Sequence, residues 1–304
     1  MIYNAVTLGY AVPEGNFDAR VHSVFQSSAN LEVRNGTGLL TLTSGTHVDL
    51  PQGIRVVAPR GLDFKSVKTD ASACYRNGLL QIEGAAWSID LRAARRWRCD
   101  LPGLNVDLEE PSTARAWEDT WIALTSRQRR EGMEIVAEEL LHVNQEPESR
   151  LAVRAGPVLR ELLAAARRLD EAAIPTVEDL LGLGGGLTPS GDDLLVGFLA
   201  GLWCTLRGMA KRAQYLEALG RAVSEGAVRT NDISRTYLQH AVRGQVSSQL
   251  EAAARAIGAG EPQQRFNRHV NLAAEIGHAS GLEGLTGLLL GLAAWDGEYL
   301  KNAP

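Results

Sequence analysis

Two adjacent carboxylates, Asp192 and Asp193, stand directly before an apolar run in the segment GLGGGLTPSGDDLLVGFLAGLW, residues 182–203. The Thr-Pro-Ser before them is typical of a helix start, with either Thr188 or Ser190 as the capping residue. The helix dipole explains one carboxylate in the first turn. Because successive helical residues point about 100° apart, both cannot make the same capping contact. We expect Asp193, three residues after Ser190, to support the cap and Asp192 to face a ligand.

The glycines at the start of this segment suggest a second kind of chemistry. Gly184, Gly185 and Gly186 precede the expected helix start, whose N–H groups can hold an anion. A P-loop is excluded because no Lys-Ser/Thr follows the glycines, and a dinucleotide fingerprint is excluded because no strand precedes them. The aspartates would repel a bare phosphate. They suit hydrogen-bond donors on an amide or ureido group, or a Mg²⁺ ion that bridges to an anion.

A second stretch, GHASGLEGLTGLLLGLAAW at residues 277–295, repeats the pattern further along the chain. Ser280 and Gly281 correspond to the Ser-Gly of the first stretch, and Glu283 corresponds to its second aspartate. His278 lies just before this second helix start, where an imidazole can move a proton or contact a ligand. Chance similarity in a Gly- and Leu-rich region is the alternative explanation.

Both stretches carry glycines four residues apart, Gly197 and Gly201 in the first and Gly287 and Gly291 in the second. Such pairs lie on one helix face and permit close backbone approach. Each glycine in a helix interior costs about 1 kcal/mol relative to alanine, so the pairs need a reason. We expect the two helices to pack tightly against each other or against similar neighbours.

A third polar group lies between the two stretches, in VRTNDISRTYLQHAVRG at residues 228–244. Thr230, Asn231 and Ser234 gather at another expected helix start. The sequence therefore predicts a site built from three helix starts that are distant along the chain.

The elements that must position these residues fall into two halves. Residues 21 to about 108 are rich in β-forming runs, separated by Asn-Gly turns at 35–36 and 77–78. From about residue 111 the apolar period becomes helical. We expect an α+β protein: an N-terminal antiparallel β-rich barrel or sandwich over residues 1–110, then a larger all-helical domain over 111–304 that carries the Gly-rich motifs.

Composition limits the class of protein. The chain has 304 residues, 45% hydrophobic and 22% charged, with a net charge of −5, so no global field attracts nucleic acid. Cys74, Cys99 and Cys204 lack metal-ligand spacing, and so few cysteines argue against a disulfide framework. No signal peptide is evident, and the apolar stretches are too short to span a bilayer. We expect a cytoplasmic oligomer without a nucleic-acid or membrane partner.

Taken together, three motifs resemble a known family. They are Gly-x-Gly-x-Gly-Leu-Thr-Pro-Ser-Gly-Asp-Asp from residue 182, Thr-x-x-x-Ser from residue 230, and Gly-His-x-Ser-Gly-x-acid-x-Leu-x-Gly from residue 277. In order and spacing they are similar to the bacterial family of the third subunit of oxamate carbamoyltransferase. The chain departs from the family pattern at Gly185, where Pro is common, and at Ala279 and Glu283, where Thr and Asp are expected.

The resemblance implies a subunit of a carbamoyltransferase complex that converts oxalurate and phosphate to oxamate and carbamoyl phosphate in purine or allantoin breakdown. It also implies partner subunits, one of them similar to an acyl-CoA synthetase. In this reading, Asp192 and His278 are the candidate catalytic residues. The candidate residues for binding the anionic or ureido substrate are Gly184, Gly185, Gly186, Thr188, Ser190, Gly191, Asp193, Thr230, Asn231, Ser234, Ser280, Gly281 and Glu283. No residue is assigned as a metal ligand, although Mg²⁺ remains a candidate cofactor.

Two other functions fit the same residues. The chain could be a non-catalytic subunit that binds a small anion or serves as a scaffold, in which case the helix starts only pack. It could also be a metal-dependent hydrolase of an amide or ureido substrate. Metal analysis separates the hydrolase from the others, and ligand titration separates the transferase from the scaffold.

Overall fold

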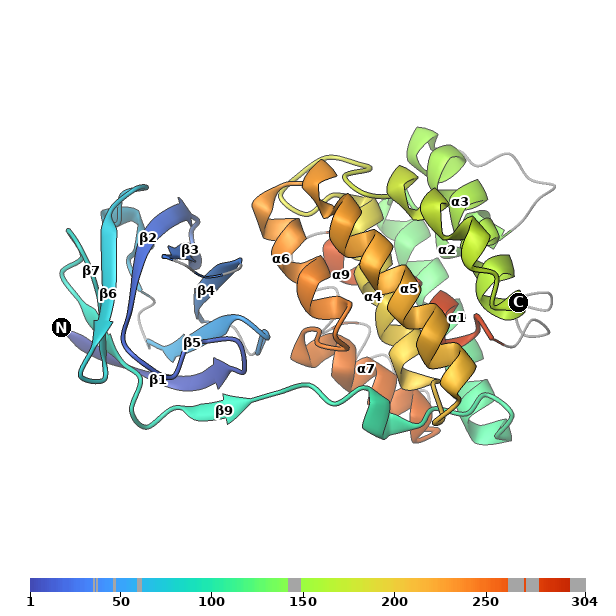
Figure 1. Cartoon of the computed structure of the whole chain (residues 1–304), viewed down its shortest axis with the longest axis horizontal. Helices are drawn as coiled ribbons and strands as arrows, with labels where there is room; N and C mark the ends of the chain where they lie inside the picture. Colours follow the sequence, from blue (N-terminus) through green and yellow to red (C-terminus); the bar gives the residue numbers. More distant parts are fainter. Residues whose placement is uncertain are drawn as a thin grey trace. The chain divides into compact units, whose positions relative to one another are not determined.

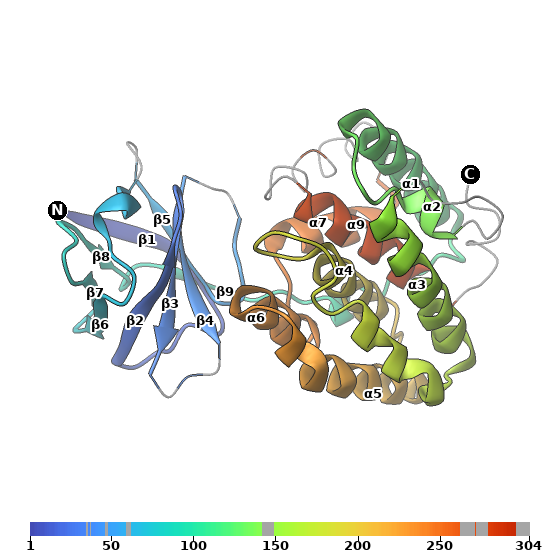
Figure 2. The ribbon, with the colours of Figure 1, turned by 90° about the horizontal axis from the view of Figure 1, so that it is seen from above.

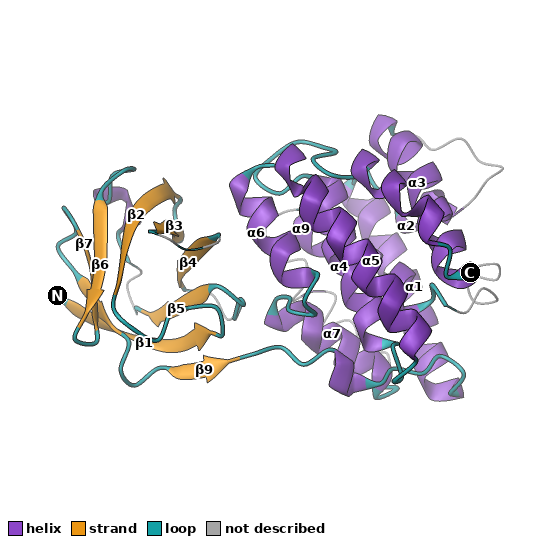
Figure 3. Cartoon of the chain, viewed as in Figure 1, coloured by secondary structure: helices purple, strands orange, loops and turns teal. Residues whose placement is uncertain are grey.

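The chain forms two compact units, Met1–Cys99 and Asp100–Pro304. A computed structural model describes residues 1–34, 36, 38–45, 48–58, 62–141, 149–261, 271 and 279–295. Within these residues every strand belongs to the first unit and every α-helix to the second (Figure 1, Figure 3). The expected order of a β-rich half followed by a helical half is confirmed.

The first unit is a closed barrel of eight strands. The ring runs β1-β5-β4-β3-β2-β6-β7-β8 and returns to β1, while β9 pairs with the later part of β1. Most neighbours are antiparallel, as expected, but β4–β5, β1–β8 and β1–β9 are parallel. The strands are β1 (Ile2–Gly9), β2 (Phe17–Val24), β3 (Ser28–Val33), β4 (Leu39–Ser44), β5 (Gly53–Val57), β6 (Ser72–Arg76), β7 (Leu79–Ile82), β8 (Ser88–Asp90) and β9 (Arg95–Trp97).

Tight turns and a buried apolar core explain how the barrel closes. Asn77 and Gly78 connect β6 to β7 with φ angles of 51° and 86°, the left-handed conformation that a two-residue hairpin turn requires. Residues from strands around the ring, including Leu31, Ile54 and Leu80, are fully buried in one cluster. The hairpin predicted at residues 77–78 is therefore confirmed.

The second unit is a bundle of helices around α4 and α9. The α-helices are α1 (Pro111–Glu131), α2 (Ala137–Leu141), α3 (Arg150–Arg168), α4 (Ser190–Cys204), α5 (Ala210–Gly226), α6 (Asp232–Ala241), α7 (Ser248–Gly258) and α9 (Ser280–Leu292). Helix α4 contacts α5, α6, α7 and α9, and α9 also contacts α1 and α7 (Figure 2). Among the described residues, no helix is both long and apolar enough to cross a membrane.

The close approach of α4 to α9 depends on the four helical glycines. A Cβ atom added to Gly197 would lie 1.9 Å from the carbonyl oxygen of Gly284, and one added to Gly287 would lie 2.0 Å from that of Leu194. Added Cβ atoms at Gly201 and Gly291 would also meet the backbone of the opposite helix, at 2.5 Å and 2.2 Å. No side chain fits in these gaps, so the predicted tight packing of the two helices is confirmed.

This geometry predicts large effects from the smallest possible substitution. Gly197→Ala and Gly287→Ala should each lower the free energy of unfolding by about 1–3 kcal/mol or more, because backbone atoms would have to move apart. The control is Gly220→Ala in α5, where the added Cβ would come no closer than 3.5 Å to Val242. There the gain in helix propensity should stabilise the protein by up to about 1 kcal/mol. Chemical denaturation of the three variants measures the difference, and equal effects would contradict the packing argument.

Candidate functional site

Helix α4 begins differently from the sequence-based prediction. Pro189 is its N-cap residue, with φ −54° and ψ 142°, and no side chain caps the helix. The expectation that Thr188 or Ser190 caps α4 with the help of Asp193 is therefore wrong, because Ser190 is already the first helical residue. The N–H of Gly191 donates to the Leu183 carbonyl at 2.8 Å, and the next two N–H groups donate to Pro189. These three donors are thus already used and are not free for an oxyanion.

Asp192 anchors the glycine-rich loop. Its carboxylate accepts hydrogen bonds from the Gly182 N–H at 2.8 Å and from the Thr230 hydroxyl, and only 1% of the residue is exposed. Burial raises the pKa of Asp192, while the bonds from Thr230 and Gly182 partly oppose that shift. The buried Ser234 hydroxyl also lowers this pKa, although it does not reach hydrogen-bond geometry. Asp192 therefore holds the loop to the start of α6, and the carboxylate expected to face a ligand is enclosed by protein.

The loop itself needs glycine for two different reasons. Gly182, Gly184 and Gly186 have φ angles of 72°, 110° and 91°, a region that favours glycine. A Cβ on Gly184 would also lie 2.9 Å from the Ser190 nitrogen, so the chain passes closely over the start of α4. Gly185 and Gly186 are exposed, and added Cβ atoms there would meet nothing within 4 Å. The base of the loop is packed and its tip is open.

Asn231 joins the same loop to α6. Its side-chain oxygen accepts hydrogen bonds from the N–H groups of Ile233 and Ser234 and caps α6, while its amide nitrogen donates to the Leu187 carbonyl at 3.0 Å. The predicted helix start at Thr230–Ser234 thus exists and contacts the first motif. Its polar groups, however, bind protein atoms.

The residues at the starts of α4 and α9 form a second group, which we call the carboxylate cluster: Thr188, Ser190, Asp193, Ser280 and Glu283. The hydroxyls of Thr188 and Ser280 are hydrogen-bonded at 2.6 Å, although these residues are far apart in sequence. The starts of the two similar motifs therefore lie next to each other in the structure. Gly281, also predicted for this site, is half-buried in the first turn of α9.

Both acids of the carboxylate cluster have raised pKa values. Burial, followed by the neighbouring charge of Glu283, raises the pKa of Asp193 well above its ordinary value, and the Ser280 and Thr188 hydroxyls oppose this shift. Burial also raises the pKa of Glu283, with the Ser190 hydroxyl opposing the shift. Only 2% of Glu283 is exposed. Each of these acids therefore keeps its proton to higher pH than a free carboxyl does.

One oxygen of the cluster is left without a protein partner. Asp193 Oδ2 is buried and accepts no hydrogen bond from the described residues. Buried polar atoms normally have partners, and an unsatisfied one costs about 1–3 kcal/mol. This oxygen can accept from an N–H group, and a protonated carboxyl or a free hydroxyl of the cluster can donate to a carbonyl. An amide or ureido group presents both.

Metal binding has limited support within the described part of the chain. Those residues contain no group of three or more His, Cys, Asp or Glu side chains placed to hold an ion. Mg²⁺ often uses only one or two carboxylates with waters and substrate phosphates, so Asp193 and Glu283 could hold it in that manner alone. His278 lies outside the described residues, and a hydrolase metal centre would need ligands from there.

The two adjacent aspartates should respond oppositely to mutation. Asp192→Ala should lower the free energy of unfolding by about 1.5–3 kcal/mol, because it removes two hydrogen bonds to a buried carboxylate. Asp193→Asn should leave stability unchanged or raise it, because it removes a buried charge beside Glu283. Thermal and urea unfolding of both variants would measure this. A larger loss of stability in Asp193→Asn than in Asp192→Ala would contradict these roles and favour the capping role that the sequence predicted for Asp193.

The raised pKa values also predict a pH dependence of stability. Folded Glu283 keeps its proton to higher pH than the unfolded chain does, so its contribution to stability falls as pH rises above about 4. The loss is about 1.4 kcal/mol per unit of pKa difference. Glu283→Gln cannot titrate, so its stability relative to the parent should increase between pH 4 and 8. Denaturation curves across that range would show it, and a constant difference would contradict it.

Comparison with known proteins agrees with the motifs. Residues 180–292 match the family described as oxamate carbamoyltransferase subunit AllH, and residues 4–96 match the AllH family N-terminal domain. Neither the curated proteins nor the solved structures give a match. The two matched regions include the barrel, the glycine-rich loop and both helices of the carboxylate cluster. The chain therefore belongs to the AllH family of oxamate carbamoyltransferase subunits.

Proposed function

We propose that this chain works in a cytoplasmic, multi-subunit oxamate carbamoyltransferase that converts oxalurate and phosphate to oxamate and carbamoyl phosphate in purine or allantoin catabolism. Family membership supports a subunit of such a complex. The observation that carries the assignment of the site is Asp193 Oδ2, which has no partner among the described residues and lies beside Glu283 at the joined starts of α4 and α9.

The carboxylate cluster complements a ureido group. Asp193 Oδ2 would accept from a substrate N–H, and whichever of the Thr188 and Ser280 hydroxyls accepts in their mutual hydrogen bond would donate its own proton to a carbonyl oxygen. In the reaction a phosphate oxygen attacks the ureido carbonyl carbon, and the bond from that carbon to the oxamate nitrogen breaks. The leaving nitrogen needs a proton, which a carboxyl with a raised pKa, such as Glu283, can supply. His278 is a second candidate for this proton transfer.

Phosphate needs a separate binding surface. Two carboxylates repel it when ionised, and the first N–H groups of α4 already donate to protein carbonyls. The cluster therefore supports binding of the ureido part of the substrate better than binding of phosphate. We propose that the chain has partner subunits, one of them similar to an acyl-CoA synthetase. One of these partners supplies the phosphate-binding groups and completes the site.

A scaffolding subunit is the second candidate, and a specific observation favours it. Asp192, Thr230 and Asn231 all bind protein atoms, so much of the first motif holds the fold together. If the carboxylate cluster also served only to join α4 to α9, the motifs would be structural. Isosteric substitutions that remove the acids of the cluster but keep its shape distinguish the two functions, because only the catalytic one requires the acids.

The test is oxalurate phosphorolysis by the complex assembled with its natural partner subunits. Glu283→Gln should lower kcat by about 10²–10⁴-fold, the usual contribution of an acid or base, and Asp193→Asn should weaken oxalurate binding, while the complex still assembles. Gly220→Ala, which lies away from the cluster, is the control and should keep full activity. If both cluster variants assemble and remain fully active, the catalytic assignment is wrong and the scaffold is favoured.

A further inference from the structure

The barrel unit carries a second potential site, on the outer face of its sheet. A cavity of about 480 Å³ lies over the neighbouring strands β2, β6 and β7 and reaches the end of β3 (Figure 1). Its volume is within the range of small-molecule sites. All of its lining residues belong to the unit Met1–Cys99, so it is separate from the carboxylate cluster of the helical unit.

The alternation of side chains along β6 explains the shape of this cavity. Ala73 points into the barrel core, so Ser72 and Cys74 on either side of it point outward. These short side chains form a floor. Longer side chains stand on both sides of it, because Asp18 on β2 and Gln81 on β7 are the two cross-strand partners of Cys74. The cavity is therefore a groove that follows β6.

Opposite charges line opposite sides of the groove. The Arg34 N–H donates to the Asp18 carbonyl at 2.9 Å, which places Arg34 on the β2 side. The Glu83 N–H donates to the Ser72 carbonyl at 2.8 Å, which places Glu83 on the β7 side. The Glu83 carboxylate also accepts from the Ser72 N–H at 3.4 Å and so stays beside the floor. Three strand spacings, about 14 Å, separate the backbones of Arg34 and Glu83 across the sheet.

The acid closest to Arg34 in the sheet is already engaged. Asp18 binds Arg76 Nη2 at 2.6 Å. Among the described residues, Arg34 and Glu83 form no ion pair with each other or with a third group. The barrel residues outside the description include no Asp or Glu, so every acid that the barrel can offer Arg34 is accounted for. The groove thus presents a guanidinium on one side and a carboxylate on the other.

We propose that this groove binds a small zwitterion, a ligand with a carboxylate at one end and an ammonium group at the other, as in an amino acid or a short peptide. The carboxylate lies against the Arg34 guanidinium, and the ammonium group lies against Glu83. The middle of the ligand lies on Ser72 and Cys74, where the Gln81 amide bonds to its polar groups. A simple anion would leave Glu83 unused, and a simple cation would leave Arg34 unused.

Calorimetric titration of the full-length chain with alanine and trialanine, each beside its N-acetyl and amide forms, tests this proposal. The free form should bind saturably, about tenfold or more tightly than either blocked form, because each block removes one charge-assisted contact. Arg34→Gln should weaken the free form by about tenfold without weakening the amide, which lacks a carboxylate. Glu83→Gln should weaken the free form without weakening the N-acetyl form. The tighter of alanine and trialanine identifies the ligand as an amino acid or a peptide.

The matched control is Arg20→Gln, on the same face of the sheet. Arg20 pairs with Glu32 at 2.9 Å and with Asp70 at 3.2 Å, and it is not among the lining residues of the groove. This variant should bind the zwitterion like the parent.

The cysteine in the floor gives a second readout. Cys74 is half-buried, whereas Cys99 and Cys204 are buried, so Cys74 should react first with iodoacetamide. A ligand lying on the floor should slow that alkylation severalfold.

Three results would overturn the proposal: no saturable binding of alanine or trialanine, blocked forms that bind as tightly as the free ones, or equal weakening by the Arg34 and Arg20 substitutions. Asp193→Asn and Glu283→Gln change the other unit and should bind the zwitterion normally. Failure of this proposal is thereby distinguishable from failure of the proposed carbamoyltransferase function.

Discussion

The backbone contact between α4 and α9 is the constraint on which the candidate site depends. Gly197 faces the Gly284 carbonyl, and Gly291 faces that of Phe198, so closely that even a methyl group would not fit. Glycine in a helix interior normally costs about 1 kcal/mol relative to alanine. Here that cost is offset by dispersion contacts along two almost fully buried helices. Because the helices cannot slide without collision, their starts are fixed side by side.

The fixed positions of the α4 and α9 starts explain how Asp193 and Glu283 can lie close together in a buried environment. Asp193 and Glu283 each lie in the first turn of a helix, where the dipole favours a negative charge. The two helix starts and the hydroxyls around them reduce the cost of burial without removing it, which is why both pKa values remain raised. Both acids therefore keep their protons to higher pH than free carboxyls do.

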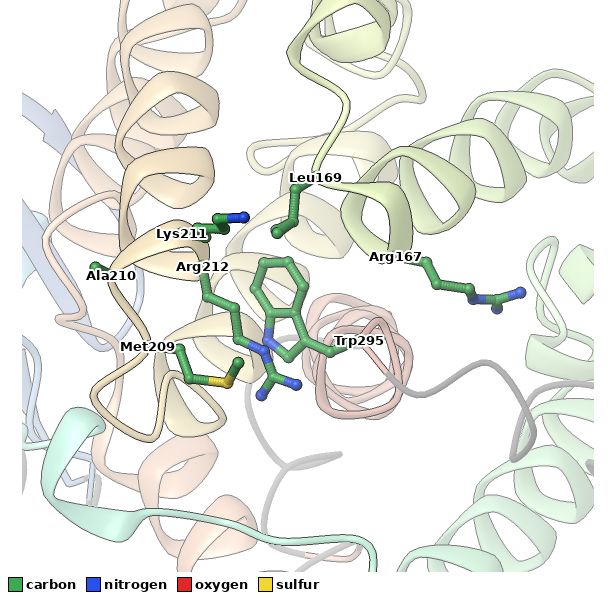
Figure 4. A pocket seen from close by; sticks show the side chains of 7 residues that line it. All are labelled: Arg167, Leu169, Met209, Ala210, Lys211, Arg212 and Trp295. Atoms are coloured by element: carbon green, nitrogen blue, oxygen red, sulfur yellow. The ribbon is translucent and has the colours of Figure 1, made fainter.

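Sequence reasoning succeeded where the signal was local or repeated. The period change marked the two halves, and the Ser-Gly-x-acid repeat, with its glycine pairs, marked the contact of α4 with α9. It did not find strand β1 (Ile2–Gly9), which completes the barrel by pairing with β5, β8 and β9. It also did not find that Arg212 lies over the Trp295 ring (Figure 4), because residues so distant in the sequence meet only after folding. Contacts between distant segments produce no periodic pattern in the sequence.

The assignment of the paired aspartates shows the same limit at the scale of one residue. On sequence grounds Asp193 was the structural acid, because the partners considered lay within one helical turn. In the structure the partners of Asp192 are Gly182 and Thr230, ten and 38 residues away, and those bonds satisfy both of its oxygens. Asp193 turns toward Glu283 and keeps one oxygen that no residue in the described part of the chain contacts by a hydrogen bond. Two adjacent acids are thus explained by one rotation of about 100°: one fastens the loop to the start of α6, and the other turns toward the start of α9.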